Sequence, residues 1–425
     1  MGVRRLTSEE WANGSLWRSR LAGAASGEQR AAVQEICRRV AEEGDAALFE
    51  FGRRFDGWAP AADQHLAVEA EQPAVALRSL PGADRAALTL AAARIRAFHE
   101  AQVYGDVAGP ESLRLLTRPV RRAGLYAPGG RAAYPSTVLM TAIPARVAGV
   151  AEVLLATPPD AGGRVAPAVL AAAAVAGVDR VYRMGGAQAV AAFAYGTESV
   201  PRADVVAGPG NVYVTLAKRE VFGAVGVDGI AGPTEIMVVA DRSAPAHLVA
   251  ADLASQLEHD PMAWAVLVTD SPVLMEAVEE AFGDLLRRLD RAETVAAANC
   301  CLVLAPSLDK AMALANDFAP EHLEIVAEEP GRLVAQVENA GAVFVGPRTP
   351  VSLADYVIGP NHTLPTGGAA RFSSPLGVYS FLKRTSVAEV DGARFAELQP
   401  AASRLARLEG LTAHAHALEA RLADE

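Results

Sequence analysis

The sequence predicts an α/β protein with two domains lying side by side. From Arg122 onward, apolar strand-like runs alternate with helical runs, and a second series of the same kind begins at Glu235. Such alternation is typical of parallel sheets covered by helices on both faces. Glycine-rich turns follow the strands of the first series, and the regular pattern fades after Gly346. We therefore expect two parallel, incomplete Rossmann-like sheets, plus small helical segments at the N and C termini.

The pattern divides the chain into four parts. Residues 1–26 lack periodicity and are expected to dock on another domain. Residues 122–233 form the first α/β domain. Residues 27–121 contain two long helical patterns, and we group them with 234–375 as the second α/β domain. Residues 376–425 are expected to form a strand pair and a helical tail, which is too small to bury a core by itself.

Composition narrows the class of protein. About half of the 425 residues are apolar, without a long uncharged segment, which predicts a large core and no transmembrane helix. A net charge of −11 argues against a general nucleic-acid binder. The three cysteines and the lack of an apolar leader favour a cytoplasmic protein. Cys300 and Cys301 open an apolar run, so we interpret them as buried small hydrophobes.

Three glycine-rich turns follow strands of the first series, at 126–130 (YAPGG), 185–188 (GGAQ) and 208–211 (GPGN). Backbone amides at the start of a helix suit a pyrophosphate, and glycine lets the ligand approach closely. Any one turn is explained by a tight connection, but three at one sheet edge predict a nucleotide site. The G-x-G-x-x-G fingerprint is absent.

The segment 228–262 leads from a glycine turn through an apolar strand into a helix whose last turn carries Gln256 and His259. Positions three apart share a helix face, so both side chains can reach one point. A histidine near a helix C-terminus is also favoured by the helix dipole alone. The spacing by itself therefore leaves metal binding open.

Five rare strings then occur in a fixed order: AGPTE at 231–235, SQLEHD at 255–260, APEHL at 319–323, DY at 355–356 and GPNH at 359–362. In order and spacing, from about Val33 to Leu418, they resemble the histidinol dehydrogenase family. The resemblance implies oxidation of L-histidinol to L-histidine through L-histidinaldehyde, the last steps of histidine biosynthesis. It also implies that two NAD molecules are consumed per turnover.

The resemblance assigns roles to individual residues. His322 would take the alcohol proton as hydride leaves for NAD, and Glu321 would activate water for the second oxidation. One zinc ion per site would be held by Gln256, His259, Asp355 and His414. NAD would contact Tyr126, Gln188 and Asn211. The substrate would contact the four metal ligands, His322, Thr234, His362 and Glu409. Nitrogen and oxygen ligands of this kind also suit manganese or cobalt.

Two positions depart from the family pattern. Thr234 stands where serine is more typical, but it keeps the hydroxyl group. His416 lies two residues beyond His414, and a locally unwound tail would leave open which of them binds the metal.

The resemblance also implies a homodimer with shared active sites, in which the tail at 392–425 crosses to the partner subunit. The tail has an apolar set that needs a surface to pack on: Leu405, Leu408, Leu411 and Leu418. Exchange of a terminal element is a low-cost route to a symmetric dimer. A tail that folds back onto its own chain remains the alternative.

Three other functions fit parts of the sequence. A paralogue could oxidise another polar primary alcohol, such as a sulfonated diol, with NAD. A zinc hydrolase would use Glu321 to activate water, and a non-catalytic binding protein would leave Glu321 and His322 without a purpose. His362, Glu409 and His414 together favour the imidazole-bearing amino alcohol. We expect a small-molecule substrate and no nucleic-acid or membrane partner.

Overall fold

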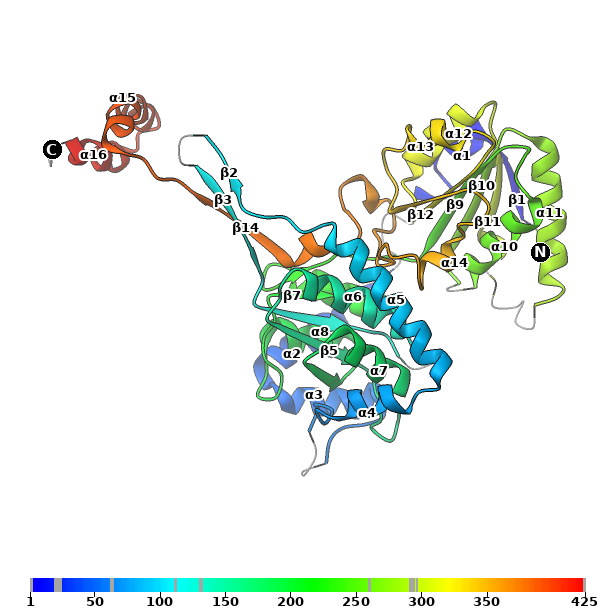
Figure 1. The fold of residues 1–425 in the computed structure, drawn as a ribbon, viewed down its shortest axis with the longest axis horizontal. Coiled ribbons are helices and arrows are strands. Elements are labelled where there is room, and N and C mark those ends of the chain that lie inside the picture. The colour runs from blue at the N-terminus through cyan, green and yellow to red at the C-terminus, as the bar shows by residue number, and fades with distance from the viewer. Residues whose placement is uncertain are drawn as a thin grey trace. The chain divides into compact units, whose positions relative to one another are not determined.

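The computed structural model describes residues 3–18, 25–61, 65–110, 113–129, 133–258, 261–289, 295 and 297–422 (Figure 1). The chain divides into two compact units. Unit 1 comprises Met1–Val103 and Val120–Phe381, and it contains both sheets predicted from the sequence. Unit 2 comprises Tyr104–Pro119 and Leu382–Glu425.

The first sheet of unit 1 is parallel throughout, in the order β6-β5-β4-β7-β8. Its strands are β4 (Arg122–Tyr126), β5 (Glu152–Thr157), β6 (Arg180–Arg183), β7 (Val205–Ala207) and β8 (Gly226–Val227). The helices between them are α6 (Pro135–Val147), α7 (Pro167–Ala176), α8 (Gly186–Tyr195) and α9 (Val212–Val221). The strand order reverses between β4 and β7, which creates the kind of crevice where open α/β sheets bind ligands.

The second sheet is also parallel, in the order β1-β11-β10-β9-β12-β13. Its strands are β1 (Arg4–Thr7), β9 (Glu235–Ala240), β10 (Trp264–Thr269), β11 (Cys300–Leu304), β12 (His322–Val326) and β13 (Ala342–Val345). Its helices are α10 (Ala246–Leu257), α11 (Pro272–Leu286), α12 (Leu308–Phe318), α13 (Pro330–Val334) and α14 (Val351–Ala354). The predicted α/β class with two parallel sheets is confirmed, and Cys300 and Cys301 are buried in β11.

The N-terminal segment lies on the second sheet. Strand β1 pairs in parallel with β11 at the sheet edge. The following helix α1 (Ser8–Ala12) buries Trp11, whose ring lies 5.4 Å from that of Phe318 in α12. Trp17 is buried in the same cluster, at 5.9 Å from Trp11. The aromatic side chains anchor a segment that has no periodic pattern of its own.

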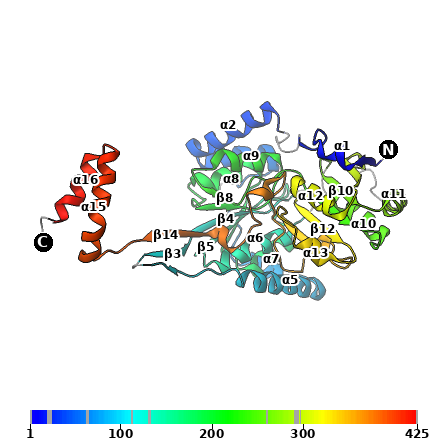
Figure 2. The same cartoon turned by 90° about the horizontal axis from the view of Figure 1, so that it is seen from above.

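The helices of 27–100 cover the first sheet, whereas the sequence analysis grouped this segment with the second. They are α2 (Gly27–Glu43), α3 (Asp45–Phe51), α4 (Gln72–Ser79) and α5 (Gly82–Glu100). Helix α2 packs on α8 and α9 (Figure 2), while α4 packs on α7 and α5 on α6. The apolar face of α2, with Val33, Ile36 and Val40, is buried against the small side chains of α8. Amphipathic periodicity showed that these helices bury one face, but it could not show against which sheet.

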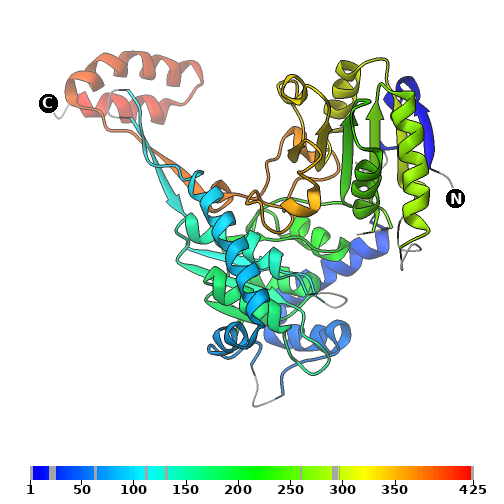
Figure 3. The same cartoon turned by 45° about the vertical axis from the view of Figure 1, so that its right-hand side comes forward.

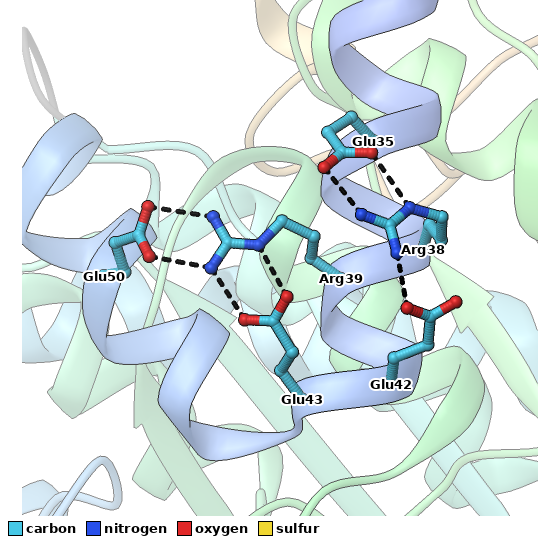
Figure 4. Close-up of polar contacts among 6 residues, drawn as sticks. All are labelled: Glu35, Arg38, Arg39, Glu42, Glu43 and Glu50. Carbon is cyan, nitrogen blue, oxygen red and sulfur yellow. Dashed lines mark hydrogen bonds and ion pairs between the residues drawn. The ribbon is translucent and has the colours of Figure 1, made fainter.

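An exposed ion-pair network joins α2 to α3 (Figure 4). Arg38 bridges two carboxylates within α2, and Arg39 bridges one in α2 and one in α3; the acids are Glu35, Glu42, Glu43 and Glu50. Exposed pairs of this kind contribute little each, on the order of 0–1 kcal/mol. Their main consequence is to fix the angle at Gly44, where the two helices meet.

Unit 2 contains an antiparallel sheet in the order β14-β3-β2 and two helices. Its elements are β2 (Val107–Ala108), β3 (Arg114–Pro119), β14 (Leu382–Val387), α15 (Gly392–Leu408) and α16 (Thr412–Glu419). The two helices pack side by side (Figure 3). The strand pair expected within 377–390 is wrong, because Val378–Phe381 forms a 3-10 turn and β14 pairs with the distant β3. In the described ranges, no helix is both long enough and apolar enough to cross a membrane.

Candidate active site

The junction between α12 and β12 carries the predicted catalytic pair. Helix α12 ends in Ala319, which has φ 52° and is the one non-glycine residue with positive φ in the described part of the chain. Such a conformation is strained for alanine and persists only when its surroundings hold it. Backbone bonds from Gly341 to Pro320 and from Ala342 to Glu321, both 2.9 Å, provide that support. The next residues, Glu321 and His322, therefore sit on a rigid turn at the N-terminal edge of the second sheet.

The Glu321 carboxyl group is buried, with 7% of the residue exposed. Its Oε2 accepts hydrogen bonds from the Thr234 hydroxyl at 2.5 Å and from the Glu235 backbone N–H at 3.0 Å. Burial raises the pKa of Glu321 to about 8, the nearby charge of Asp355 raises it further, and the two hydrogen bonds oppose the shift. A carboxyl group with this pKa can both hold and accept a proton near neutral pH.

The His322 ring is held in one orientation. Its Nδ1 lies 3.0 Å from the backbone oxygen of Glu235. A carbonyl oxygen only accepts hydrogen bonds, so Nδ1 carries the proton and the basic lone pair of the neutral ring is on Nε2. Nδ1 is also 3.5 Å from Glu321 Oε2, and the ring packs against Phe344 with 6.0 Å between centroids. The imidazole is thus preorganised to take a proton at Nε2.

Thr234 connects this pair to Gln256, which is buried in the last turn of α10. The Gln256 side-chain nitrogen donates to the Thr234 hydroxyl. Because that hydroxyl gives its only proton to Glu321, it must accept from an N–H group of the amide, which fixes the amide orientation. The other end of the amide, Oε1, is then the atom that can serve as an oxygen ligand to a cation.

Asp355 and His362 adjoin the same site. Asp355 caps the C-terminus of α14, and its backbone oxygen lies 3.0 Å from Nδ1 of His362. The charge of Asp355 is close enough to raise the pKa of Glu321. The structure therefore brings together six of the predicted residues: Thr234, Gln256, Glu321, His322, Asp355 and His362.

Three further residues predicted for this site lie outside the described part of unit 1. His259 lies outside the described residues, and Glu409 and His414 belong to unit 2. Within the described ranges, no three side chains of His, Cys, Asp or Glu gather closely enough to hold a metal ion. Helix α16 is regular through His414 and His416, so these two side chains point to different sides of it.

The predicted NAD contacts lie where strand order reverses in the first sheet. The Tyr126 hydroxyl, at the end of β4, accepts a hydrogen bond of 3.2 Å from the Gly186 N–H, and burial raises its pKa to about 12. Asn211 caps α9 by accepting bonds from two backbone amides. Gly208 has φ 122°, and a Cβ there would lie 2.1 Å from the Tyr126 backbone oxygen. Only glycine fits this close approach between the two turns.

Two residues of these sites were missed by the sequence analysis. Asp56 accepts hydrogen bonds of 3.2 Å from the Gly185 N–H and from the side chain of Gln188. It lies in a short π-helix far from both in sequence, so no local pattern could find it. Glu235 stands inside the AGPTE string without an assigned role, yet its backbone oxygen orients His322 and its side chain accepts from the Gly367 N–H at 3.1 Å.

A small cavity of about 30 Å³ lies between the turns of the first sheet and the loop that follows α14. Gly208, Lys218 and Asp228 line it from the first sheet, and Thr363 and Leu364 line it from the loop that follows α14. Lys218 and Asp228 form a buried ion pair of 2.5 Å beneath the Gly208 turn. The same loop also contacts the turn that precedes Thr234, because the Thr366 hydroxyl accepts a hydrogen bond from the Gly232 N–H.

Comparison with known proteins identifies the family. The sequence matches the family model described as histidinol dehydrogenase over residues 20–422. The chain belongs to the histidinol dehydrogenase family. A protein of Synechococcus sp. (strain ATCC 27144) named histidinol dehydrogenase is 48% identical over 403 residues, covering 92% of each chain. The histidinol dehydrogenase of Bordetella parapertussis is 49% identical over 401 residues, covering 92% of this chain and 90% of the relative.

A solved structure shows that the family fold is shared. The crystal structure of histidinol dehydrogenase from Elizabethkingia anophelis superimposes with a TM-score of 0.91 at 32% identity. The match covers 99% of this chain and 98% of that one. The family resemblance inferred from five short strings is therefore confirmed over nearly the whole chain, and the protein is a dehydrogenase by family.

Proposed function

We propose that the protein oxidises L-histidinol to L-histidine through L-histidinaldehyde, as the last steps of histidine biosynthesis, with two NAD molecules consumed per turnover. Family membership and the names of its relatives support this function. The observation that carries it is the buried pair of Glu321 and His322, in which the carboxyl pKa is raised to about 8 and the imidazole is oriented through Nδ1. Two proton-transfer groups side by side suit two successive oxidations.

In the first oxidation, His322 takes the hydroxyl proton of the alcohol at Nε2 while hydride leaves the same carbon. The bond from Nδ1 to the Glu235 carbonyl stabilises the imidazolium ion that forms. The carboxyl group of Glu321, 3.5 Å from Nδ1, adds to this stabilisation when it is ionised. NAD, when bound, accepts the hydride, and Tyr126, Gln188 and Asn211 are the residues we expect to hold it.

In the second oxidation, Glu321 takes a proton from the water that adds to the aldehyde. The His322 imidazolium left by the first oxidation returns its proton to the carbonyl oxygen, which gives the hydrate and makes His322 neutral again. His322 then takes a hydroxyl proton from the hydrate as the second hydride leaves, which yields the carboxylic acid. The hydroxyl of Thr234 and the amide of Glu235 both donate to Glu321 Oε2 and so support its ionised form. Each of the two oxidations moves one hydroxyl proton to His322 Nε2 and one hydride, with its two electrons, to NAD, while the hydration between them moves no electrons.

One zinc ion per site would be held by Gln256, His259, Asp355 and His414. The orientation of the Gln256 amide fits this role, because its nitrogen is engaged by Thr234 and its oxygen is the ligand end. A carboxylate, imidazoles and an amide oxygen match the ligands that zinc prefers when a position is left for substrate. When bound, zinc would hold the imidazole and amine of the substrate as a template.

The assembly we propose is a homodimer with shared sites, in which the tail at 392–425 brings Glu409 and His414 to the partner subunit. Two observations support it. The tail belongs to unit 2, a separate compact unit. Its leucines at 398, 405 and 408 are 44%, 59% and 68% exposed, so they need a surface to cover them. We place the enzyme in the cytoplasm, acting on a small molecule.

A spectrophotometric assay tests the function. L-Histidinol with NAD should produce two NADH per histidine formed, and a chelator should abolish the signal until zinc is restored. The same assay with a sulfonated diol in place of L-histidinol tests for the paralogue, which would form NADH from the diol and not from L-histidinol. A zinc hydrolase would produce no NADH from either alcohol, and that outcome would refute the proposal.

A further inference from the structure

A second buried carboxyl group follows the catalytic pair on the same strand. Glu324 lies two residues after His322 in β12, so the two side chains point to the same face of the sheet. Glu324 is 2% exposed. The layer around it is otherwise apolar, with Val238, Leu253 and Phe344 in one core cluster. Burying a carboxyl group in such surroundings lowers the free energy of unfolding unless the group forms hydrogen bonds.

The first partner of Glu324 is Asp252 in α10. The two carboxyl groups lie close enough to interact, and burial raises the pKa of both, with the charge of Asp252 adding to the shift of Glu324. Oε2 of Glu324 meets no N–H or hydroxyl donor in the described ranges. Two ionised carboxylates repel each other, so we expect one of the pair to carry a proton that it donates to the other. Asp252 stands four residues before Gln256 and therefore on the same face of the helix.

The second partner of Glu324 is the start of α14. Its Oε1 accepts a hydrogen bond of 3.1 Å from the backbone N–H of Val351. Val351 is the first residue of this four-residue helix, and Asp355 caps its other end. One side chain thus bonds both to the helix that carries Gln256 and to the helix that carries Asp355.

We propose that Glu324 is a positioning residue for the reaction, which fixes the spacing of His322, Gln256 and Asp355 by joining β12, α10 and α14. The inference rests on the proposed function for the roles of those three residues. A well-packed apolar side chain would fill the same space without a desolvation cost, and replacing buried ion pairs in this way is often neutral or stabilising. What an apolar residue cannot supply is directional bonding to two other elements. Partners that orient metal ligands typically affect metal affinity or activity about 10- to 100-fold.

The test compares three variants for zinc affinity, measured by competition with a chromogenic chelator, and for kcat and KM with L-histidinol. Glu324→Gln keeps both bonds, because the amide nitrogen can donate to Asp252 and the oxygen can accept from Val351; it should stay near wild type. Glu324→Leu removes both bonds and should lower zinc affinity and kcat about 10- to 100-fold. Ile325→Ala is the matched control, since Ile325 is buried on the opposite face of the same strand and its loss destabilises without touching the site.

A fourth variant guards against misfolding of Glu324→Leu. Asp252→Ala removes one of the two bonds and leaves Val351 engaged, so it should give an intermediate loss of zinc affinity. The inference is overturned if Glu324→Leu and Ile325→Ala show the same zinc affinity and kcat, or if Glu324→Gln is as damaging as Glu324→Leu. A wild-type protein that forms no NADH from L-histidinol would refute the proposed function instead, and the zinc affinities would still decide the role of Glu324.

Discussion

The two sheets of unit 1 have the same architecture, but their candidate sites lie at opposite edges. The first sheet offers its C-terminal edge, where Tyr126 and the glycine turns at 185–186 and 208–210 end the strands. The second sheet offers its N-terminal edge, where Thr234, Glu321 and His322 precede or begin β9 and β12. The rule that open α/β sheets bind ligands beyond the strand C-termini describes only the first.

The difference follows from what each edge supplies. At the first edge, backbone amides and glycine residues line the turns, and a Cβ at Gly208 would lie 2.1 Å from the backbone oxygen of Tyr126. At the second edge, the proton transfer that we propose needs buried side chains and no helix N-terminus. Helix α10 instead brings its C-terminal turn, with Gln256, to the strand starts. The comparison teaches that binding by backbone and catalysis by side chains can be divided between two similar sheets.

The largest effect should come from His322→Asn at the second edge. Asparagine cannot take the substrate proton, and general acid–base groups contribute about a hundred- to ten-thousand-fold in rate. Turnover with L-histidinol should fall by that factor while zinc content, measured by metal analysis, stays near wild type. Loss of zinc together with activity would mean that His322 is a metal ligand, and the proposed role of His322 in proton transfer would be wrong.

Much of this arrangement could be predicted from the sequence. Apolar periodicity located most strands of both sheets, because a buried strand needs an apolar run wherever it lies. It did not indicate the edge strands β1 and β8. The strings around Thr234 and His322 pointed to residues that the structure brings together, since each string is local. The glycine turn at Gly208 was predicted for the same reason.

Contacts between distant segments could not be predicted in this way. The pairing of β3 with β14 and the packing of α2 on α8 depend on complementary surfaces that no local pattern identifies. Asp56 and Glu324 were missed because each acts through a partner more than 25 residues away. Their roles follow from three-dimensional contacts, which the sequence alone does not display.

Subunit mixing tests whether the active site at the second sheet is formed by one chain or by two. His414→Ala and His259→Ala chains, each inactive alone, are combined and allowed to exchange subunits. With shared sites, a heterodimer has one site with both lesions and one with neither, so up to half of the activity of a wild-type dimer should return. If proven heterodimers remain inactive, each chain completes its own site and the exchanged tail is refuted.

Glu321→Gln should separate the two oxidations. Glutamine keeps the size but cannot accept the water proton, so oxidation of supplied L-histidinaldehyde should fall more than oxidation of the alcohol. The wild-type second step should speed up as pH rises through about 8, because the ionised carboxylate is the base and burial holds the pKa of Glu321 there. The variant should lose that rise. Stopped-flow traces with each substrate across pH decide, and equal slowing of both steps would contradict the assigned roles.

The smallest effect should come from the first edge, through Gly208→Ala. The added Cβ would meet the backbone oxygen of Tyr126, and φ 122° is strained for alanine, so the turn must shift. We expect a higher KM for NAD, on the order of tenfold, and a loss of about 1–3 kcal/mol in the free energy of unfolding. The kcat at saturating NAD should change little, since the proposed proton-transfer groups, Glu321 and His322, lie at the other sheet. Gly331→Ala is the control, because a Cβ at Gly331 meets nothing within 4 Å. A fall in kcat with an unchanged KM would show that the first edge shapes the chemical step as well as binding, and the contrast between the two sheets would no longer hold.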